Sequence, residues 1–412
     1  MLHRSALLAV LVCAPLAARA GVRQETPASA AADTAPTAAP AATPALAPQP
    51  AAAATPAAAT PAAPTPAAPT PAAPTPAAAT AAAPTPAGPA PPAASPAAEA
   101  VATPFDLRRP EIANFVDEVV SHDGFSRKAV VTLLAQAQPQ QKIIEAMSRP
   151  LEKVAPWWDY RERFMTPERI DRGAQFWLDH RLTLERVAAQ YQVPAEYLVA
   201  IIGVETYYGR VTGPYRALDA LATLAFDYPP REKFFRSELE EFLILTRENR
   251  LDPLTVKGSY AGALGVPQFM PSQYRRYAVD ADTDNRRDLW SNWDDILASV
   301  ANYLHEYGWT PGAPVLAETS LDPDPSFQIE PHNLELNETV GSLAAHGVRV
   351  EGDLPAETPA VLLSAEQRDG PAYRVGFHNF YVITRYNRSA RYAMTVHDLA
   401  TAIAARVRGM QP

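Results

Sequence analysis

The sequence has almost no cysteine: Cys13 is the only one among 412 residues. A single thiol excludes a disulfide within the chain. Cys13 also lies in the first 20 residues, which have the features of a cleaved export signal. We therefore expect a mature protein with no thiol, stabilised by a hydrophobic core although its compartment would permit disulfides.

Basic residues are also scarce. The chain has 36 Lys and Arg against 45 Asp and Glu, which gives a net charge of −9. The first 103 residues hold three charges of each sign, so residues 104–412 retain the whole net charge. An acidic folded region argues against a generic nucleic-acid surface, and we expect no nucleic-acid partner.

The N-terminus carries the long apolar run that an export signal needs. In MLHRSALLAVLVCAPLAARA, a short basic start precedes the apolar run and a small-residue Ala18-Arg19-Ala20 site. This pattern indicates a signal peptide over residues 1–20 rather than a membrane span. A lipoprotein would need a small residue before Cys13, where Val12 stands. We therefore expect a soluble periplasmic form without a transmembrane helix.

Residues 21–103 form an Ala/Pro/Thr-rich segment, with PAAPTPAAPTPAAPT at its centre. Such a composition cannot bury enough apolar surface to fold. It favours extended polyproline II at about 3.1 Å per residue, so the segment could reach on the order of 200 Å. We predict a disordered tether here and a folded region over residues 104–412, which is long enough for one large or two unequal domains.

Helical periodicity dominates the folded region. It predicts helices over 112–120, 129–137, 141–147, 234–249 and 294–308. Thr166 followed by Pro167 predicts the start of one long helix to about Tyr191, and another helix starts near Pro194. Strand signals occur only over 360–363 and 380–384. The predicted fold class is mainly α, within α+β, with a small β element near the C-terminus.

One carboxylate stands where an apolar helix meets a glycine, in IIGVETYYGR. Glu205 shares a helical face with Tyr197, Ile201 and Tyr208. Apolar surroundings disfavour the ionised form, so Glu205 could stay protonated and act as a general acid. The spacing leaves open the alternative of a solvated Glu205 or one paired with Arg210.

A loop with polar side chains follows later in the chain. Residues 257–271, KGSYAGALGVPQFMP, have an irregular backbone fixed by glycine and proline, with Ser259, Gln268 and Met270 as contacts of the kind a sugar-binding groove uses. By itself this stretch indicates only a structured loop.

An acidic loop follows over residues 280–288. Asp280, Asp282 and Asp284 alternate, and the seventh position supplies the Arg286 carbonyl, as in an EF-hand calcium loop. Two positions depart from that pattern. Asn285 replaces the turn glycine, although it tolerates a left-handed backbone, and the twelfth position is Ser291. In a longer loop, Asp294 or Asp295 would supply the last calcium ligand. The alternative is a turn whose carboxylates are solvated and bind no metal.

Several ordered stretches together resemble the lytic murein transglycosylases of the membrane-bound B type. They are GVETYYGRVTGPYRALDALATLAFDYP, KGSYAGALGVPQFMPSQYRRYAVD, SVANYLHEYGW and NFYVITRYNRSARYAM, and the resemblance covers essentially all of residues 104–412. It implies a lysozyme-like catalytic domain with helical additions. It also implies cleavage of peptidoglycan glycan strands between N-acetylmuramic acid and N-acetylglucosamine, with formation of a 1,6-anhydromuramic end. The resemblance implies that the chemistry needs no cofactor and that the protein binds a structural Ca²⁺.

The resemblance also implies roles for individual residues. Glu205 would be the single catalytic acid/base. The substrate-binding set would comprise Ser259, Gln268, Tyr260, Met270, Tyr386, Asn387, Arg231 and Tyr160. Of these, Arg231 and Tyr160 would meet the peptide stems, and Pro230 stands where the family usually has a first arginine. The metal ligands would be Asp280, Asp282, Asp284, the Arg286 carbonyl and Asp295, with Asp294 as the alternative to Asp295.

Two rival functions follow from the same residues. A muramidase-type hydrolase would add Asp219 or Asp227 as a second carboxylate, but both positions favour capping or a buried hydrogen-bonded role. A non-catalytic murein-binding protein would have no need of Glu205. Cell-wall synthesis or divisome proteins would be the protein partners.

Overall fold

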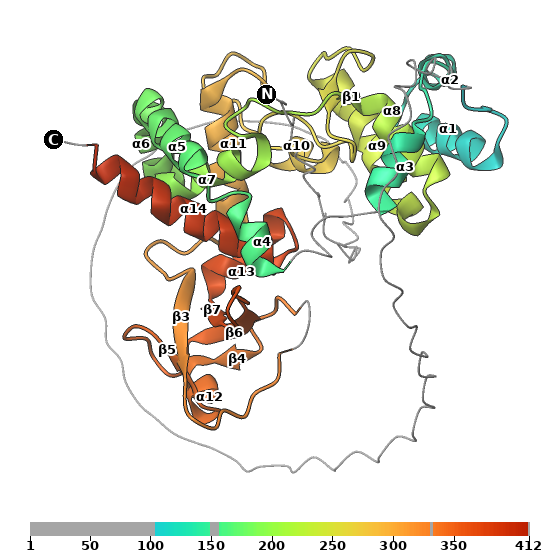
Figure 1. Ribbon diagram of the computed structural model, residues 1–412. Coiled ribbons are helices and arrows are strands. Elements are labelled where there is room, and N and C mark those ends of the chain that lie inside the picture. Colours follow the sequence, from blue (N-terminus) through green and yellow to red (C-terminus); the bar gives the residue numbers. More distant parts are fainter. Residues whose placement is uncertain (1–103, 149–155, 330–332, 411–412) are drawn as a thin grey trace, which may run out of the picture. The chain divides into compact units, whose positions relative to one another are not determined.

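Helices make up most of the part of the chain that the computed structural model describes, residues 104–148, 156–329 and 333–410 (Figure 1). The predicted signal peptide and tether, residues 1–103, lie outside the described residues. Everything described falls within one compact unit.

The elements follow one another in this order. The helices before the sheet are α1 (Pro110–Asp123), α2 (Arg127–Leu134), α3 (Gln141–Ser148), α4 (Trp157–Glu162), α5 (Pro167–Asp179), α6 (Arg181–Tyr191), α7 (Ala195–Thr206), α8 (Ala217–Asp227), the 3₁₀ turn η2 (Pro229–Arg231), α9 (Glu232–Glu248), α10 (Pro271–Tyr277) and α11 (Trp293–Glu306). The later helices are α12 (Val340–Ala345), α13 (His378–Tyr386) and α14 (Ala390–Arg408). The strands are β1 (Tyr215–Arg216), β2 (Lys257–Gly258), β3 (Leu316–Leu321), β4 (Glu338–Thr339), β5 (Val348–Val350), β6 (Pro359–Ser364) and β7 (Tyr373–Gly376).

The helix α7 lies at the centre of the helical part. Its residues from Tyr197 to Thr206 are all buried, and it packs against α5 and α14. A helix that is apolar on all sides belongs in a protein interior rather than at its surface. The chain therefore carries Glu205, near the end of α7, into the core. The helices predicted over 112–120, 141–147, 234–249 and 294–308 are confirmed as α1, α3, α9 and α11.

The small β element is an antiparallel sheet with strand order β4-β6-β7-β3-β5. Successive side chains of β6 alternate between two hydrophobic cores. Ala360 and Leu362 pack with Val348 and Phe377, whereas Val361 and Leu363 belong to the main core. Such alternation is the period of two that a strand imposes. The strand predicted over 360–363 is therefore confirmed, and both of its faces are covered.

The strand predicted over 380–384 is wrong, because these residues lie in the helix α13. The run FYVIT is rich in residues that favour strands. A short apolar run can nevertheless be a buried helix, and periodicity does not separate the two. Here nearly every side chain of α13 is buried, and Asn379 anchors its start by donating to the carbonyls of Thr310 and Ala313, at 2.8 and 3.0 Å. Long-range contacts of this kind override local propensity.

The single helix predicted from Thr166 to Tyr191 is also wrong in its length. The cap is confirmed, because the Thr166 side chain accepts from the Arg169 amide, but the helix breaks at His180 into α5 and α6. The His180 ring packs 4.4 Å from the Phe176 ring and 4.9 Å from the Trp293 ring. The break lets α5 pack on α14 while α6 packs on α11.

A buried charge cluster joins α14 to the sheet. The Asp398 carboxylate accepts from Arg161 Nε at 2.5 Å and from Arg374 on β7 at 2.8 Å. Arg374 also pairs with Glu318 on β3 at 2.6 Å. One carboxylate on α14 therefore holds both α4 and the sheet.

Candidate active site

A left-handed turn ends α7. Tyr207 and Tyr208 have φ of 52° and 61°, so the chain reverses and the Tyr208 ring folds back on the helix. Its hydroxyl donates to the Arg169 carbonyl at 2.9 Å. A Cβ at Gly203 would lie only 2.7 Å from the Tyr208 hydroxyl oxygen and 2.8 Å from two of its ring carbons, so this close approach requires glycine. The backbone geometry therefore fixes where Glu205 stands.

The Glu205 side chain is buried, with 2% of its surface exposed. The Tyr392 hydroxyl on α14 donates a hydrogen bond to Glu205 Oε1 at 2.7 Å. The solvated alternative for Glu205 is therefore wrong. Burial raises the pKa of Tyr392 well above its usual range, and the nearby Glu205 adds to the rise. Tyr392 thus stays a neutral donor at any physiological pH.

Two tyrosines from the C-terminal segment lie beside Glu205. The rings of Tyr386 and Tyr392 stack with their centroids 6.4 Å apart. Burial raises the pKa of Tyr386 well above its usual range, and the nearby Glu205 raises it further. The Tyr386 hydroxyl donates to the Pro267 carbonyl at 2.6 Å, and buried Asn387 follows at the end of α13. The structure therefore brings the predicted Tyr386-Asn387 pair to the polar loop.

No pattern along the chain singles out Tyr392 as a site residue. It stands in NFYVITRYNRSARYAM, six residues after Tyr386, among several other aromatic residues. Only the crossing of α14 over α7 brings its hydroxyl to the carboxylate. The stretch NFYVITRYNRSARYAM as a whole indicates a part of the site, but nothing in it distinguishes Tyr392 from the other aromatic residues.

The polar loop over 257–270 holds Ser259 and Gln268 in buried positions. Ser259 Oγ accepts from the Ala263 amide at 3.2 Å. Gln268 has a φ of 54°, and its Nε2 donates to the carbonyls of Thr212 and Gly265, at 3.0 and 2.9 Å. These bonds fix the side-chain amide in one orientation. Tyr260 is also mostly buried.

Met270 lies deeper than the resemblance implied. Its exposed fraction is 0%. A residue that lines an open groove would expose some of its side chain. Met270 instead packs in the hydrophobic core beneath the polar loop. The Met270 amide donates a hydrogen bond to Gln273 Oε1 at 2.9 Å, at the start of α10.

Side chains of neighbouring elements tie the loop in place. Thr206, next to Glu205, donates to the Val266 carbonyl at 3.0 Å. The Val266 amide donates to the Leu289 carbonyl at 2.7 Å. Glu238 on α9 accepts from the Ser272 amide and hydroxyl at 2.9 and 2.6 Å, and burial raises the pKa of Glu238 to about 7. The helix α7 and the polar loop are therefore one connected unit.

The two residues expected at the peptide stems lie in different surroundings. Tyr160 on α4 is 5% exposed, packs its ring 5.1 Å from the Phe164 ring, and raises the pKa of Tyr392 as a minor cause. It therefore lies on the Tyr392 side of Glu205. The Arg231 guanidinium stacks over Phe234 at 4.2 Å and is half-buried near Glu238.

Both candidate second carboxylates hold structural bonds. Asp219 accepts from the Gln138 amide at 2.8 Å and from Arg216 Nε at 3.0 Å. Asp227 pairs with Arg109 at 2.6 Å. These contacts agree with the capping and hydrogen-bonded roles that the sequence favoured for them.

The acidic loop gathers three carboxylates. Oxygens of Asp280, Asp282 and Asp284 all lie within 4.8 Å of one another. Asp280 accepts from the amides of Asp284 and Asn285, at 3.1 and 2.9 Å. Asn285 has a φ of 65°, the left-handed backbone expected where an EF-hand has glycine. Clustered carboxylate oxygens suit a hard cation such as Ca²⁺.

The two aspartates at the start of α11 face opposite ways. Asp295 is fully buried, and its two oxygens accept from the amides of Ala281 and Asp288 at 2.7 and 2.8 Å. Asp294 instead accepts from Thr183 at 3.0 Å and pairs with Arg186, both on α6. Asp295 therefore holds the two ends of the acidic loop by hydrogen bonds, and Asp294 joins α11 to α6.

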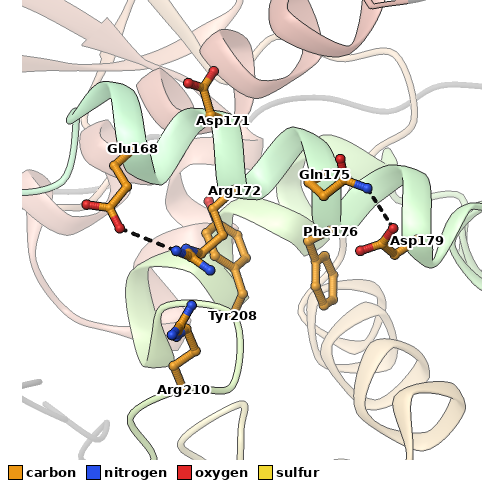
Figure 2. Close-up of a pocket in the computed structure, with 8 residues that line it drawn as sticks. All are labelled: Glu168, Asp171, Arg172, Gln175, Phe176, Asp179, Tyr208 and Arg210. Carbon is orange, nitrogen blue, oxygen red and sulfur yellow. Dashed lines mark hydrogen bonds and ion pairs between the residues drawn. The ribbon is translucent and has the colours of Figure 1, made fainter.

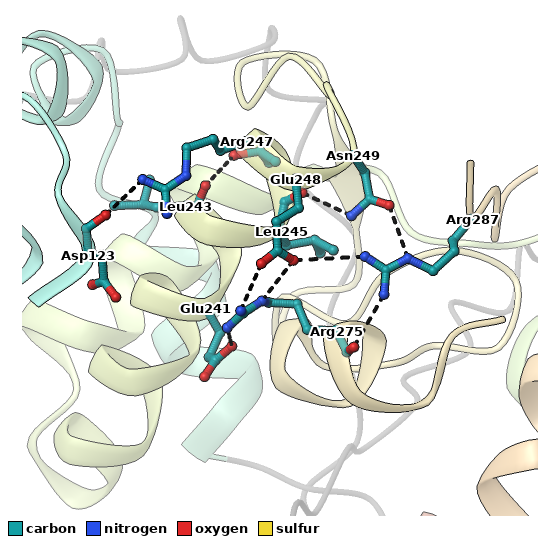
Figure 3. A network of polar contacts seen from close by, with 10 residues as sticks. Asp123, Glu241, Leu243, Leu245, Arg247, Glu248, Asn249, Arg275 and Arg287 are labelled. Atoms are coloured by element: carbon teal, nitrogen blue, oxygen red, sulfur yellow. Dashed lines mark hydrogen bonds and ion pairs between the residues drawn. The ribbon is translucent and has the colours of Figure 1, made fainter. Parts of the chain in front are cut away.

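An ion-pair network connects the end of this loop to α9 and α10 (Figure 3). Arg287 donates to Asn249 at 3.2 Å and to the Arg275 carbonyl at 3.2 Å. Arg275 in turn pairs with Glu241 and, at 2.8 Å, with Glu248. The acidic loop and the polar loop are thus braced by the same two helices.

Among the described residues, no single helix is long and apolar enough to cross a membrane, although the bent pair of α6 and α7 would pass by length and composition.

Comparison with known proteins agrees with this geometry. The family described as Transglycosylase SLT domain matches residues 108–401. Membrane-bound lytic murein transglycosylase B of Escherichia coli is 41% identical over 309 residues, which cover 73% of this chain and 84% of that protein.

Two solved structures show the same likeness. Soluble lytic transglycosylase SltB1 of Pseudomonas aeruginosa is 45% identical with a TM-score of 0.67, covering 73% of this chain and 100% of that one. Escherichia coli lytic transglycosylase Slt35 in complex with calcium is 38% identical with a TM-score of 0.68, covering 75% and 97%. The chain therefore belongs to the SLT-domain family of lytic murein transglycosylases.

Proposed function

We propose that this lytic transglycosylase cleaves the bond between N-acetylmuramic acid and N-acetylglucosamine in peptidoglycan and leaves a 1,6-anhydromuramic end. The observation that carries the proposal is the buried Glu205 carboxyl with Tyr392 as its hydrogen-bond donor. Asp219 and Asp227 support it indirectly, because both are occupied by structural bonds. A conventional glycosidase would need a second carboxylate at the sugar.

In the proposed mechanism one residue serves as acid and then as base. Glu205 protonates the leaving glycosidic oxygen, and the muramic 2-acetamido carbonyl supports the oxocarbenium-like centre. The Glu205 carboxylate then accepts the proton of the muramic C6 hydroxyl, whose oxygen closes onto C1. The proton count balances and no water is consumed. Tyr392 stabilises the carboxylate stage by donating to Oε1.

The remaining site residues would position the sugar. Ser259 and Asn387 would orient the acetamido group, because a neighbouring group helps only when it is held in attack geometry. Gln268, Tyr260 and Tyr386 would complete the wall of the site.

Product analysis tests this function. Purified protein is incubated with murein sacculi, and the released muropeptides are weighed by mass spectrometry. We expect ends lighter by one water molecule than those that a muramidase produces. Hydrated muramic ends would instead favour a hydrolase with a second carboxylate. Binding to sacculi without release of any product would favour the non-catalytic murein-binding protein.

We propose further that the acidic loop binds a structural Ca²⁺. Asp280, Asp282, Asp284 and the Arg286 carbonyl would be its ligands, with Asp295 as the closing residue. The solved Slt35 complex contains calcium, which supports the assignment. The ion would supply rigidity, since the proton chemistry is assigned to Glu205.

Chelation should lower the melting temperature. A ligand at about 100 times its Kd stabilises the folded state by about 2.7 kcal/mol. We expect excess Ca²⁺ to raise Tm by several degrees over a chelator-treated sample, and Asp282→Asn to reduce that difference strongly. Differential scanning calorimetry measures both. An identical Tm with Ca²⁺ and with chelator would refute the metal assignment.

The proposed location is the periplasm, after removal of residues 1–20. The peptidoglycan strand is the proposed substrate partner, and cell-wall synthesis or divisome proteins are the proposed protein partners.

A further inference from the structure

Thr206 stands directly after Glu205 and is completely buried, with an exposed fraction of 0%. The ordinary partner of a buried threonine hydroxyl in a helix is the carbonyl four residues earlier. Here that carbonyl belongs to Ile202 and lies 3.4 Å from Thr206 Oγ1. It already accepts the amides of Tyr207 and Tyr208. Backbone groups of the helix end therefore take the place that the hydroxyl would usually fill.

The Thr206 hydroxyl instead joins two segments outside the helix. It donates to the Val266 carbonyl in the polar loop at 3.0 Å, and it accepts from the Gly209 amide at 3.1 Å. A hydroxyl has one proton and two lone pairs, so both bonds form at once. One atom, Thr206 Oγ1, therefore links the polar loop to the turn that ends α7.

The loop side of this link is fixed from a second direction. The Val266 amide donates to the Leu289 carbonyl at 2.7 Å. A Cβ at Gly265 would lie 2.5 Å from the same Leu289 oxygen, so the two segments are in close contact. The Gln268 side chain in turn donates to the Gly265 carbonyl at 2.9 Å. The Thr206 hydroxyl is therefore bonded to a rigid part of the loop, next to the bonds that orient Gln268.

The other side of the link is the turn after α7, whose outer side faces a pocket. The pocket has a volume of 760 Å³ and lies between α5 and the turn, with Tyr208 among its lining residues (Figure 2). Tyr207 and Tyr208 have a left-handed backbone. Such a backbone costs free energy in residues other than glycine and persists only when the surrounding structure holds it. The bond from the Gly209 amide to Thr206 is one of the inner contacts that hold the turn.

We propose that Thr206 is a positioning residue for glycan cleavage, and that its hydroxyl sets the place of the Glu205 carboxyl relative to the polar loop. The inference rests on the proposed function, in which Glu205 transfers the proton while Ser259 and Gln268 hold the sugar. Neighbouring Cα atoms are about 3.8 Å apart, so a shift of Thr206 moves Glu205 with it. An acid must lie within hydrogen-bond reach of the oxygen that it protonates. A misplacement of about 1 Å can cost roughly 10²-fold in rate.

Two substitutions separate the hydroxyl from the rest of the side chain. Thr206→Val keeps the size and removes the hydroxyl, whereas Thr206→Ser keeps the hydroxyl and removes the methyl group. Both are assayed on soluble oligosaccharides of the murein repeat, so that kcat and KM are obtained separately. We expect Thr206→Val to lose about 10- to 100-fold in kcat with KM within about twofold, because the sugar still binds an intact loop. Thr206→Ser should stay within about threefold of the wild-type kcat, since the bond is retained.

The matched control is Thr246→Val on α9. The Thr246 hydroxyl is also buried, but it donates within its own helix, to the Leu243 carbonyl at 2.9 Å. Its loss should leave kcat unchanged, because no bond to the polar loop is removed. Melting curves show whether each variant is folded at the assay temperature. If Thr206→Val does not fold, Thr206→Ala takes its place in the comparison with Thr206→Ser.

The kinetics decide the case in either direction. A wild-type kcat in the variant without the hydroxyl overturns the proposal. So does an equal loss of kcat with and without the hydroxyl, because the effect would then follow the methyl group. A rise in KM at unchanged kcat overturns it as well, since the hydroxyl would then serve sugar binding alone. Failure of the proposed function is seen separately, as cleavage retained by Glu205→Gln or as wild-type products with hydrated ends.

Discussion

Glu205→Gln is expected to abolish nearly all turnover while leaving the fold intact. The amide is close to the carboxyl in size and can still accept the Tyr392 hydroxyl bond, which is 2.7 Å long in the structure. It can neither donate the acid proton nor take up the C6 hydroxyl proton. General acid–base catalysis contributes roughly 10²- to 10⁴-fold, and here one residue would perform both transfers. We therefore expect a loss in kcat at the upper end of that range.

Release of soluble muropeptides from labelled sacculi measures the effect. The matched control is Glu196→Gln, the same substitution in the first turn of the same helix, which should retain activity. Melting curves of both variants show whether the fold has changed. Near wild-type cleavage by Glu205→Gln would mean that another group supplies the proton, and the mechanism would have to be abandoned.

Asp398→Ala is expected to destabilise the protein by about 3 kcal/mol, because removing one partner of a buried ion pair leaves a charge uncompensated. The Asp398 and Arg374 side chains are only 6% and 13% exposed. Glu318 remains as a partner of Arg374, which places the effect at the lower end for buried pairs. For a folded region of this size, Tm should fall by roughly 5 °C.

Thermal denaturation followed by circular dichroism measures this loss. Asp322→Ala is the matched control, because Asp322 also pairs with an arginine, Arg349, but at the surface of the sheet. It should change Tm far less, since solvent screens an exposed pair. Equal shifts in the two variants would show that burial adds nothing at Asp398, and would refute the role of this carboxylate in joining α14 to the sheet.

The site was only partly predictable from the sequence. The position of Glu205 at the end of an apolar helix is a local pattern, and the structure confirms its burial. The alternating carboxylates of the acidic loop are local as well, and their oxygens do cluster. In contrast, Tyr392 and Asp295 acquire their roles through partners 187 and 14 residues away, at Glu205 and Ala281. Spacing along the chain carries no information about such partners.

The errors in the fold have the same origin. Residues 380–384 have the composition of a strand, yet they form a helix because α13 is enclosed by the core and anchored at Asn379. No glycine or proline near His180 predicts that the helix ends there. Packing of α5 and α6 against different helices decides it.

The sequence by itself determined the mainly helical class and, through its ordered motifs, the family; it also predicts an export signal, a tether and a folded region. These depend on composition and on local periodicity, which every short stretch displays. Only the tertiary structure decided that Tyr392 meets Glu205 and that Asp295 rather than Asp294 accepts hydrogen bonds from the acidic loop. The physical reason is that hydrogen bonds and ion pairs act over a few ångströms in space, whatever the distance along the chain.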